Sequence, residues 1–163
     1  MRQFTLNLNK KYQRPIVELK SWHGVEAMLD TGAVFPVWTG EESILRDLKG
    51  RLYKENVSFT GFGGVSHGNL YILPSIMIGV LEFKDMPIIA SKDLEDVPFQ
   101  MLLSATMFSD LIYEIDDKHH KLYVKIPDGE DNERRLKVRD SNGRLHILCN
   151  DDSNDQWPTC MEV

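Results

Sequence analysis

Short runs in which apolar and polar residues alternate occur along most of the chain. In the run FTLNLN, Phe4, Leu6 and Leu8 alternate with polar residues. Alternation with a period of two places the apolar side chains on one face of a strand. The same pattern and apolar runs between turn residues predict further strands in the segments 15–30, 55–91, 99–126 and 134–150. The chain is therefore expected to consist mostly of β-sheet.

One segment, TGEESILRDLKG at 39–50, favours a helix instead. Its apolar residues recur with helical spacing. Thr39 and Glu42 have the spacing of a capping box, and Gly50 can end the helix. A second, short helical stretch is expected after the apolar strand that ends at Ser104.

Turn residues predict several hairpins. Asn142-Gly143 is a strong signal for a two-residue turn, and another turn is expected near His23-Gly24. The segment 55–79 predicts a longer hairpin with flexible glycines at its tip, namely Gly61, Gly63, Gly64 and Gly68.

Composition is that of an ordinary globular protein. The 163 residues are 42% hydrophobic, enough for one domain with a core. The net charge of −6 argues against nucleic-acid and anionic-membrane partners. No apolar run approaches the roughly 18 residues of a membrane span, and the first residues lack a signal-peptide pattern. We therefore expect a cytoplasmic protein.

Cysteine and histidine patterns do not predict a cofactor or a metal. Cys149 and Cys160 are expected to be reduced thiols, with a disulfide or half a metal site as the alternatives. Their spacing does not fit a zinc site. His119 and His120 are adjacent, so on a strand they would point in opposite directions, and a solvated turn is expected there.

The polar segment PDGEDNE at 127–133 is typical of a linker. We expect a first domain over residues 1–126. Residues 127–163 would form an extension that comprises a hairpin and an acidic tail.

Three features carry candidate chemistry. A carboxylate between two apolar runs is either a turn residue or a functional group, because aspartate is uncommon in strands. The first feature is such a carboxylate and the residues after it, Asp30, Thr31, Gly32 and Ala33. The second is the hairpin tip, Gly61, Phe62, Gly63, Gly64 and Val65. The third is the end of an apolar strand, Leu102, Leu103 and Ser104.

Two carboxylates that share one proton can hydrolyse a peptide bond without a metal. The ionised carboxylate takes a proton from water, and the protonated one donates to the carbonyl oxygen. The chain contains one Asp-Thr-Gly sequence. None of the other aspartates stands in such a sequence. The simplest source of the second carboxylate is therefore a twofold homodimer in which two copies of Asp30 meet at the axis.

The order of these features over 16–126 resembles the retropepsin-like aspartic proteases, in particular the bacterial group. The resemblance implies an all-β, closed acid-protease barrel with one or two short helices and a hairpin flap. It implies a homodimeric aspartic endopeptidase that cuts peptides or proteins, with Asp30 as the catalytic residue. Thr31 would bond across the dimer axis, the Gly32 N–H would reach a carboxylate oxygen, and Ala33 would be a small neighbour.

One departure keeps a second function open. The family has a glycine where this chain has Ser104, and a side chain there must be accommodated beside the Asp30 loop. The alternative is a catalytically inactive module of the same fold that binds a peptide or a protein partner. A further idea is an inactive monomer in which the segment after Pro127 blocks dimerisation.

Overall fold

Strands predominate in the computed structural model, which confirms the all-β prediction. The structure describes residues 1–9, 14–19, 22, 24–30, 32–61, 64–94, 97–141 and 144–150. The strands are β1 (Arg2–Asn7), β2 (Ile16–Leu19), β3 (Val25–Asp30), β4 (Val37–Trp38), β5 (Arg51–Gly61), β6 (Gly64–Ile78), β7 (Leu81–Ala90), β8 (Met101–Ser104), β9 (Ile112–Asp116), β10 (Lys121–Ile126), β11 (Glu133–Ser141) and β12 (Arg144–Cys149). The helices are α1 (Glu42–Asp47) and the 3₁₀ helix η2 (Ala105–Phe108).

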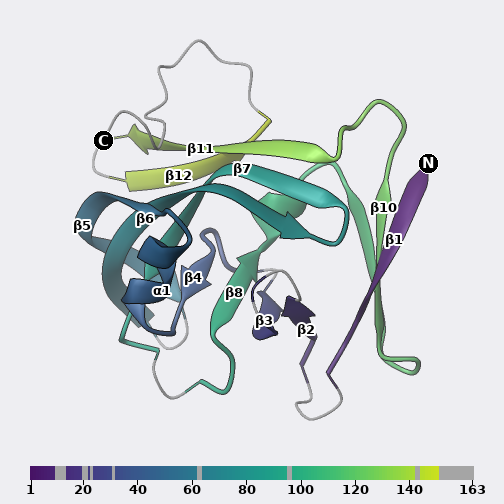
Figure 1. Cartoon of the computed structure of the whole chain (residues 1–163), viewed down its shortest axis with the longest axis horizontal. Helices are drawn as coiled ribbons and strands as arrows, with labels where there is room; N and C mark the ends of the chain where they lie inside the picture. The colour runs from purple at the N-terminus through teal and green to yellow at the C-terminus, as the bar shows by residue number, and fades with distance from the viewer. Residues whose placement is uncertain are drawn as a thin grey trace.

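The described strands form a larger and a smaller sheet. In the larger sheet the order is β12-β11-β7-β4-β8-β3-β2, and β6 pairs with β7 and with β5. The smaller sheet has the order β1-β10-β9. Figure 1 shows β5, β6 and α1 on one side of β8 and the smaller sheet on the other. Closure of a barrel stays a prediction.

Alternation along β3 and β8 divides their side chains between two apolar clusters. The strands pair in parallel. Leu29 and Leu103 belong to the main core, whereas Met28 and Leu102 belong to a second, smaller cluster. Successive side chains of a strand point to opposite faces of the sheet, so the two clusters lie on opposite faces of β3 and β8.

The glycine-rich hairpin is longer than predicted, because β5 and β6 together extend over 51–78. Phe62 and Gly63, at the predicted tip, lie outside the described residues. Gly68 was expected in the tip but lies inside β6. A Cβ there would stand 2.3 Å from the Ala90 carbonyl oxygen, so close packing against β7 explains this glycine.

Helix α1 confirms the predicted helix but not its predicted cap. The N-cap residue is Glu41, and it makes no side-chain cap bond. The Thr39 hydroxyl donates instead to the Phe99 carbonyl oxygen at 2.7 Å. Thr39 therefore attaches the segment before α1 to the loop before β8. Neither α1 nor any other helix of the described chain has the length and apolar character to cross a membrane.

The C-terminal hairpin joins the larger sheet directly. Glu133–Arg135 of β11 pairs in parallel with Glu82–Lys84 of β7, and Figure 1 shows β11 and β12 beside β7. Leu136 and Ile147 are buried in the main core. The hairpin thus contributes to the core, and the boundary between residues 126 and 127 stays a prediction.

Four further sequence predictions lie outside the described residues. They concern His23, the turn at Asn142-Gly143, the acidic tail at 151–163 and Cys160. The strands that flank the Asn142-Gly143 turn do pair, with Ser141 opposite Arg144.

Candidate active site

Asp30 is the last residue of β3, and it is half-buried. Its Oδ1 accepts a hydrogen bond from the Gly32 N–H at 3.0 Å. Its carbonyl oxygen accepts another from the Ala33 N–H at 3.1 Å. The chain therefore turns tightly after the strand and holds the carboxylate against the turn. The Gly32 bond is the one expected from the sequence, and Thr31 lies outside the described residues.

Ser104 is the neighbour of Asp30 on the adjacent strand. The two residues are register partners in the parallel pair β3–β8. Register partners project their side chains to the same face of a sheet. Ser104 is 0% exposed, and its Oγ has no hydrogen-bond partner among the described residues. A buried hydroxyl that no group of the described chain bonds therefore lies on the strand next to the carboxylate.

Replacing Ser104 by alanine should raise the free energy of unfolding by roughly 1 kcal/mol, because an unpaired buried hydroxyl is destabilising. Denaturant titrations of the two proteins under conditions that keep the chain monomeric measure the difference. A loss of stability of about 1 kcal/mol in the variant would contradict this expectation, since it would mean that the hydroxyl is bonded.

An apolar cluster occupies the face of the sheet to which Asp30 belongs. Met28 precedes Asp30 by two residues, and Leu102 precedes Ser104 by two, so these side chains share one face. Met28 and Leu102 are buried in the second cluster. The cluster also includes two residues of the segment between β7 and β8, Leu94 and Phe99. The sequence analysis missed both, because their spacing does not relate them to Asp30.

The glycine-rich hairpin reaches the same cluster through Phe59. This side chain of β5 is half-buried and packs against the second cluster. Near the tip, Gly61 pairs with Gly64. Gly64 has a φ of 135°, a backbone conformation that residues other than glycine rarely adopt. Val65 is 67% exposed, so the end of the hairpin presents an apolar side chain to the surroundings.

Two hydrogen bonds hold the hairpin where its pairing with β7 ends. The His67 N–H donates to Asp93 Oδ2 at 2.7 Å, and the Ser91 hydroxyl donates to the His67 carbonyl oxygen at 2.7 Å. Before His67, β6 pairs only with β5 in the described chain. The base of the hairpin is thus held by β7 and by these two bonds, whereas in its end β5 and β6 pair only with each other among the described strands.

Helix α1 is attached to β6 by Glu42. Its Oε1 accepts hydrogen bonds from the Tyr71 hydroxyl at 2.6 Å and from Asn69 Nδ2 at 2.9 Å. Burial raises the pKa of Glu42, but these bonds and the charge of Arg46 outweigh it, so the pKa lies below its ordinary value. The carboxylate is therefore charged at neutral pH, and this attachment weakens only when acid protonates it.

Metal-ligating side chains do not gather in the part of the chain that the structure describes. It contains no group of three His, Cys, Asp or Glu residues that could hold a metal ion. His119 lies in an exposed turn, where its Nδ1 is 2.8 Å from Asp116 Oδ2. The turn predicted near His119 and His120 is thereby confirmed.

The arrangement of strands matches that of a solved structure, a retropepsin-like aspartic protease from Rickettsia conorii. The TM-score is 0.54, and the match covers 77% of this chain and 91% of that chain at 19% sequence identity. The fold is retropepsin-like. No family model and no curated protein sequence matches the chain. At this identity the structural likeness establishes the retropepsin-like fold, and the chemistry has to be argued from the site.

The retropepsin-like fold brings some of the predicted site residues together and separates others. Asp30, Gly32 and Ser104 meet where β3 and β8 end, and Leu102 lies on the same face. Leu103 faces the main core. The hairpin contacts the second cluster through Phe59, a residue that the sequence analysis did not single out.

Proposed function

We propose that the chain is an aspartic endopeptidase that acts as a homodimer on peptides or proteins. The observation that carries this proposal is the position of Asp30. Its carboxylate is held by the Gly32 N–H at the end of β3, and β3 and β8 carry an apolar cluster that the hairpin also contacts. A half-buried carboxylate at the end of a buried apolar cluster, together with a hairpin that can close, suits the hydrolysis of a peptide.

Three other aspartates of the described chain already have partners, which supports the need for a second subunit. Asp85 pairs with Arg135, Asp93 accepts from the His67 N–H, and Asp116 bonds to His119. Each of these three carboxylates is thus bonded to a group other than Asp30. A twofold axis next to Asp30 would supply the second carboxylate from an identical loop.

The loop after Asp30 has features that suit such an axis. Val34 is 54% exposed, although valine is usually buried. Ala33 offers no side-chain hydrogen bond to the carboxylate. Thr31 is the residue that we expect to bond across the axis, as the family resemblance implies.

The proposed reaction needs one proton on the carboxylate pair. The ionised carboxylate takes a proton from water as the water oxygen attacks the peptide carbonyl carbon, and the protonated carboxyl donates its proton to the carbonyl oxygen. The pair then donates a proton to the peptide nitrogen and recovers one from a hydroxyl of the intermediate while the C–N bond breaks. The product is a carboxylic acid and an amine, and the pair again holds one proton. Closure of the hairpin would exclude bulk water from these steps.

Ser104 favours a second candidate function, a binding module that does not cut. Its buried hydroxyl stands where the family has a glycine, close to the Asp30 turn. Peptides that bind and persist uncut from acid to neutral pH, equally well after Asp30→Asn, would support that function.

Mixing experiments test the shared site. Wild-type chain co-refolded with a ninefold excess of the Asp30→Asn chain should lose about tenfold in hydrolysis of a proteome-derived peptide library, because only about one-tenth of wild-type subunits then pair with each other. The control is an equal excess of Asp116→Asn chain, which should not lower hydrolysis. Hydrolysis that is independent of added Asp30→Asn chain would overturn the shared dimer site.

The cytoplasmic location and the bacterial origin expected from the sequence belong to the same proposal. The net charge of −6 supports a protein that acts without a nucleic-acid partner.

A further inference from the structure

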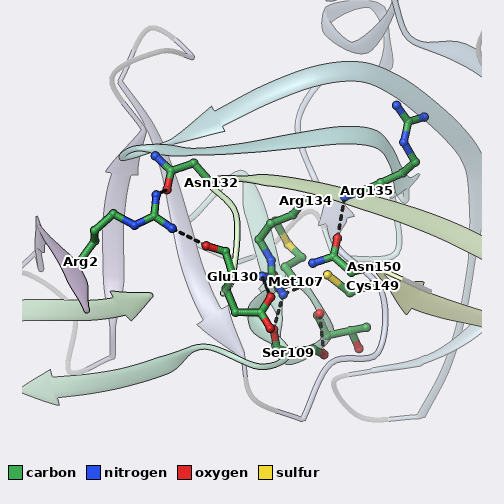
Figure 2. Close-up of polar contacts among 10 residues, drawn as sticks. Arg2, Met107, Ser109, Glu130, Asn132, Arg134, Arg135, Cys149 and Asn150 are labelled. Carbon is green, nitrogen blue, oxygen red and sulfur yellow. Dashed lines mark hydrogen bonds and ion pairs between the residues drawn. The ribbon is translucent and has the colours of Figure 1, made fainter. Parts of the chain in front are cut away.

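Arg134 of β11 is fully buried, with 0% of its surface exposed. A buried guanidinium is costly unless its donors are hydrogen-bonded. Figure 2 shows the side chain between Met107, Ser109 and Cys149. Its Nε donates to the Met107 carbonyl oxygen at 3.0 Å. Its Nη2 donates to the Ser109 carbonyl oxygen and lies 3.1 Å from Cys149 Sγ.

Other groups around Arg134 compensate its charge only weakly. Glu130 Oε2 lies 4.0 Å from Nη1, which is too long for a hydrogen bond. Burial raises the pKa of the Cys149 thiol, and the nearby guanidinium offsets only part of this rise, so the thiol is neutral. The bonds of Arg134 therefore go chiefly to the backbone of one short segment.

That segment is the end of η2, where a short helix leaves carbonyl groups without helical partners. Backbone N–H groups of the following turn donate hydrogen bonds to the carbonyl oxygens of Thr106 and Phe108. Arg134 donates to the carbonyl oxygens of Met107 and Ser109. Four successive carbonyl groups are thus bonded, and two of them depend on a side chain from the C-terminal hairpin.

Helix η2 connects this contact to the candidate active site. It begins directly after Ser104, the register partner of Asp30. The Thr106 hydroxyl is 3.5 Å from the carbonyl oxygen of Val34, in the loop that follows Asp30. A helix that Arg134 holds at one end therefore contacts both the end of β8 and the Asp30 loop.

We infer that Arg134 is a positioning residue for Asp30, an inference that rests on the proposed function for its catalytic part. Arg134 fixes the end of η2, and η2 fixes the end of β8 and the Asp30 loop relative to each other. The two carboxylates of a dimer can share a proton only if these loops hold them at a set distance. An apolar residue at this position could fill the same space but could not bond the Met107 and Ser109 carbonyl oxygens.

The test compares Arg134→Met and Arg134→Lys with Arg135→Met. Arg135 follows Arg134 on the same strand, but its side chain pairs with Asp85 and points away from η2. Arg135→Met therefore removes the same kind of side chain without touching η2. Lysine at position 134 keeps the charge and can bond one carbonyl group, so it should rescue part of the effect.

Two measurements distinguish positioning from general destabilisation. Hydrogen exchange at the Ala33, Ser109 and Leu111 amides should be at least about tenfold faster in Arg134→Met and unchanged in Arg135→Met. With the best-cleaved library peptide, kcat of Arg134→Met should fall about 100-fold while KM stays within about threefold. Arg134→Lys should lie between wild type and Arg134→Met in both measurements.

Each outcome decides the inference. Unchanged exchange at these three amides in Arg134→Met would overturn it, and if that variant does not fold, unchanged exchange in Arg134→Lys would do so. A kcat within about twofold of wild type would also overturn it while leaving the proposed function intact. If the wild type cleaves nothing, the proposed function fails, and faster exchange in the Arg134 variants still supports the role of Arg134 in positioning the Asp30 loop.

Discussion

Replacing Asp30 by asparagine should abolish peptide hydrolysis while the chain stays folded. An amide cannot take a proton from water, so kcat should fall by at least about 1,000-fold. The amide oxygen can still accept the bond from the Gly32 N–H that holds Asp30 Oδ1 at 3.0 Å. The turn should therefore persist, with a change in unfolding free energy of no more than about 1 kcal/mol. Cleavage of the peptide library and thermal unfolding measure the two effects.

The matched control is Asp116→Asn. Asp116 is also a carboxylate at the end of a strand, and its pKa is lowered by hydrogen bonds from His119 in an exposed turn. That turn belongs to the smaller sheet, so removing the Asp116 carboxylate should leave cleavage unchanged. Full cleavage by the Asp30→Asn chain would refute the assignment of Asp30 as the catalytic residue. Tight binding of uncut peptides by both the wild type and Asp30→Asn would identify a binding module.

Removing the chain after Pro127 should prevent stable folding. The deletion takes away β11, which pairs with β7. It also removes Leu136, Val138 and Ile147 from the main core. Three buried aliphatic side chains contribute about 5–9 kcal/mol, which is comparable to the whole stability of many domains. Circular dichroism and thermal unfolding should therefore show no cooperative transition for residues 1–127.

The control for this deletion ends the chain at Asn150 and keeps both β11 and β12. It removes the acidic segment that the sequence predicts to be a tail, so we expect cooperative unfolding close to that of the full chain. A folded fragment of residues 1–127 would contradict the prediction. If that fragment also dimerised, sedimentation would support the idea that the C-terminal segment blocks assembly.

Local sequence patterns predicted most strands of this chain. The alternation in FTLNLN corresponds to β1, and the apolar run before Ser104 corresponds to β8. Such patterns are readable because neighbouring side chains alternate between the faces of a strand. The two-residue strand β4 was not predicted, since it is too short to show a period. The cap at Thr39 was predicted wrongly, because the Thr39 hydroxyl donates instead to the Phe99 carbonyl oxygen, a tertiary contact.

The candidate site was predicted in its residues but not in its surroundings. Asp-Thr-Gly after an apolar strand pointed to Asp30, and the bond from Gly32 follows from that local turn. Leu94, Phe99 and Arg134 could not be assigned, because each is far from Asp30 in the sequence. Their contributions depend on which segments the folded sheet brings together.

The amino-acid sequence by itself determined that this chain forms strands, a glycine-rich hairpin and a turn that holds Asp30, because those signals arise between residues close along the chain. Only the tertiary structure decided that Ser104 is the buried register partner of Asp30. It also decided that an arginine of the C-terminal hairpin bonds the helix that follows Ser104. These contacts join segments separated by many residues, and they depend on how the sheets pack rather than on any local preference.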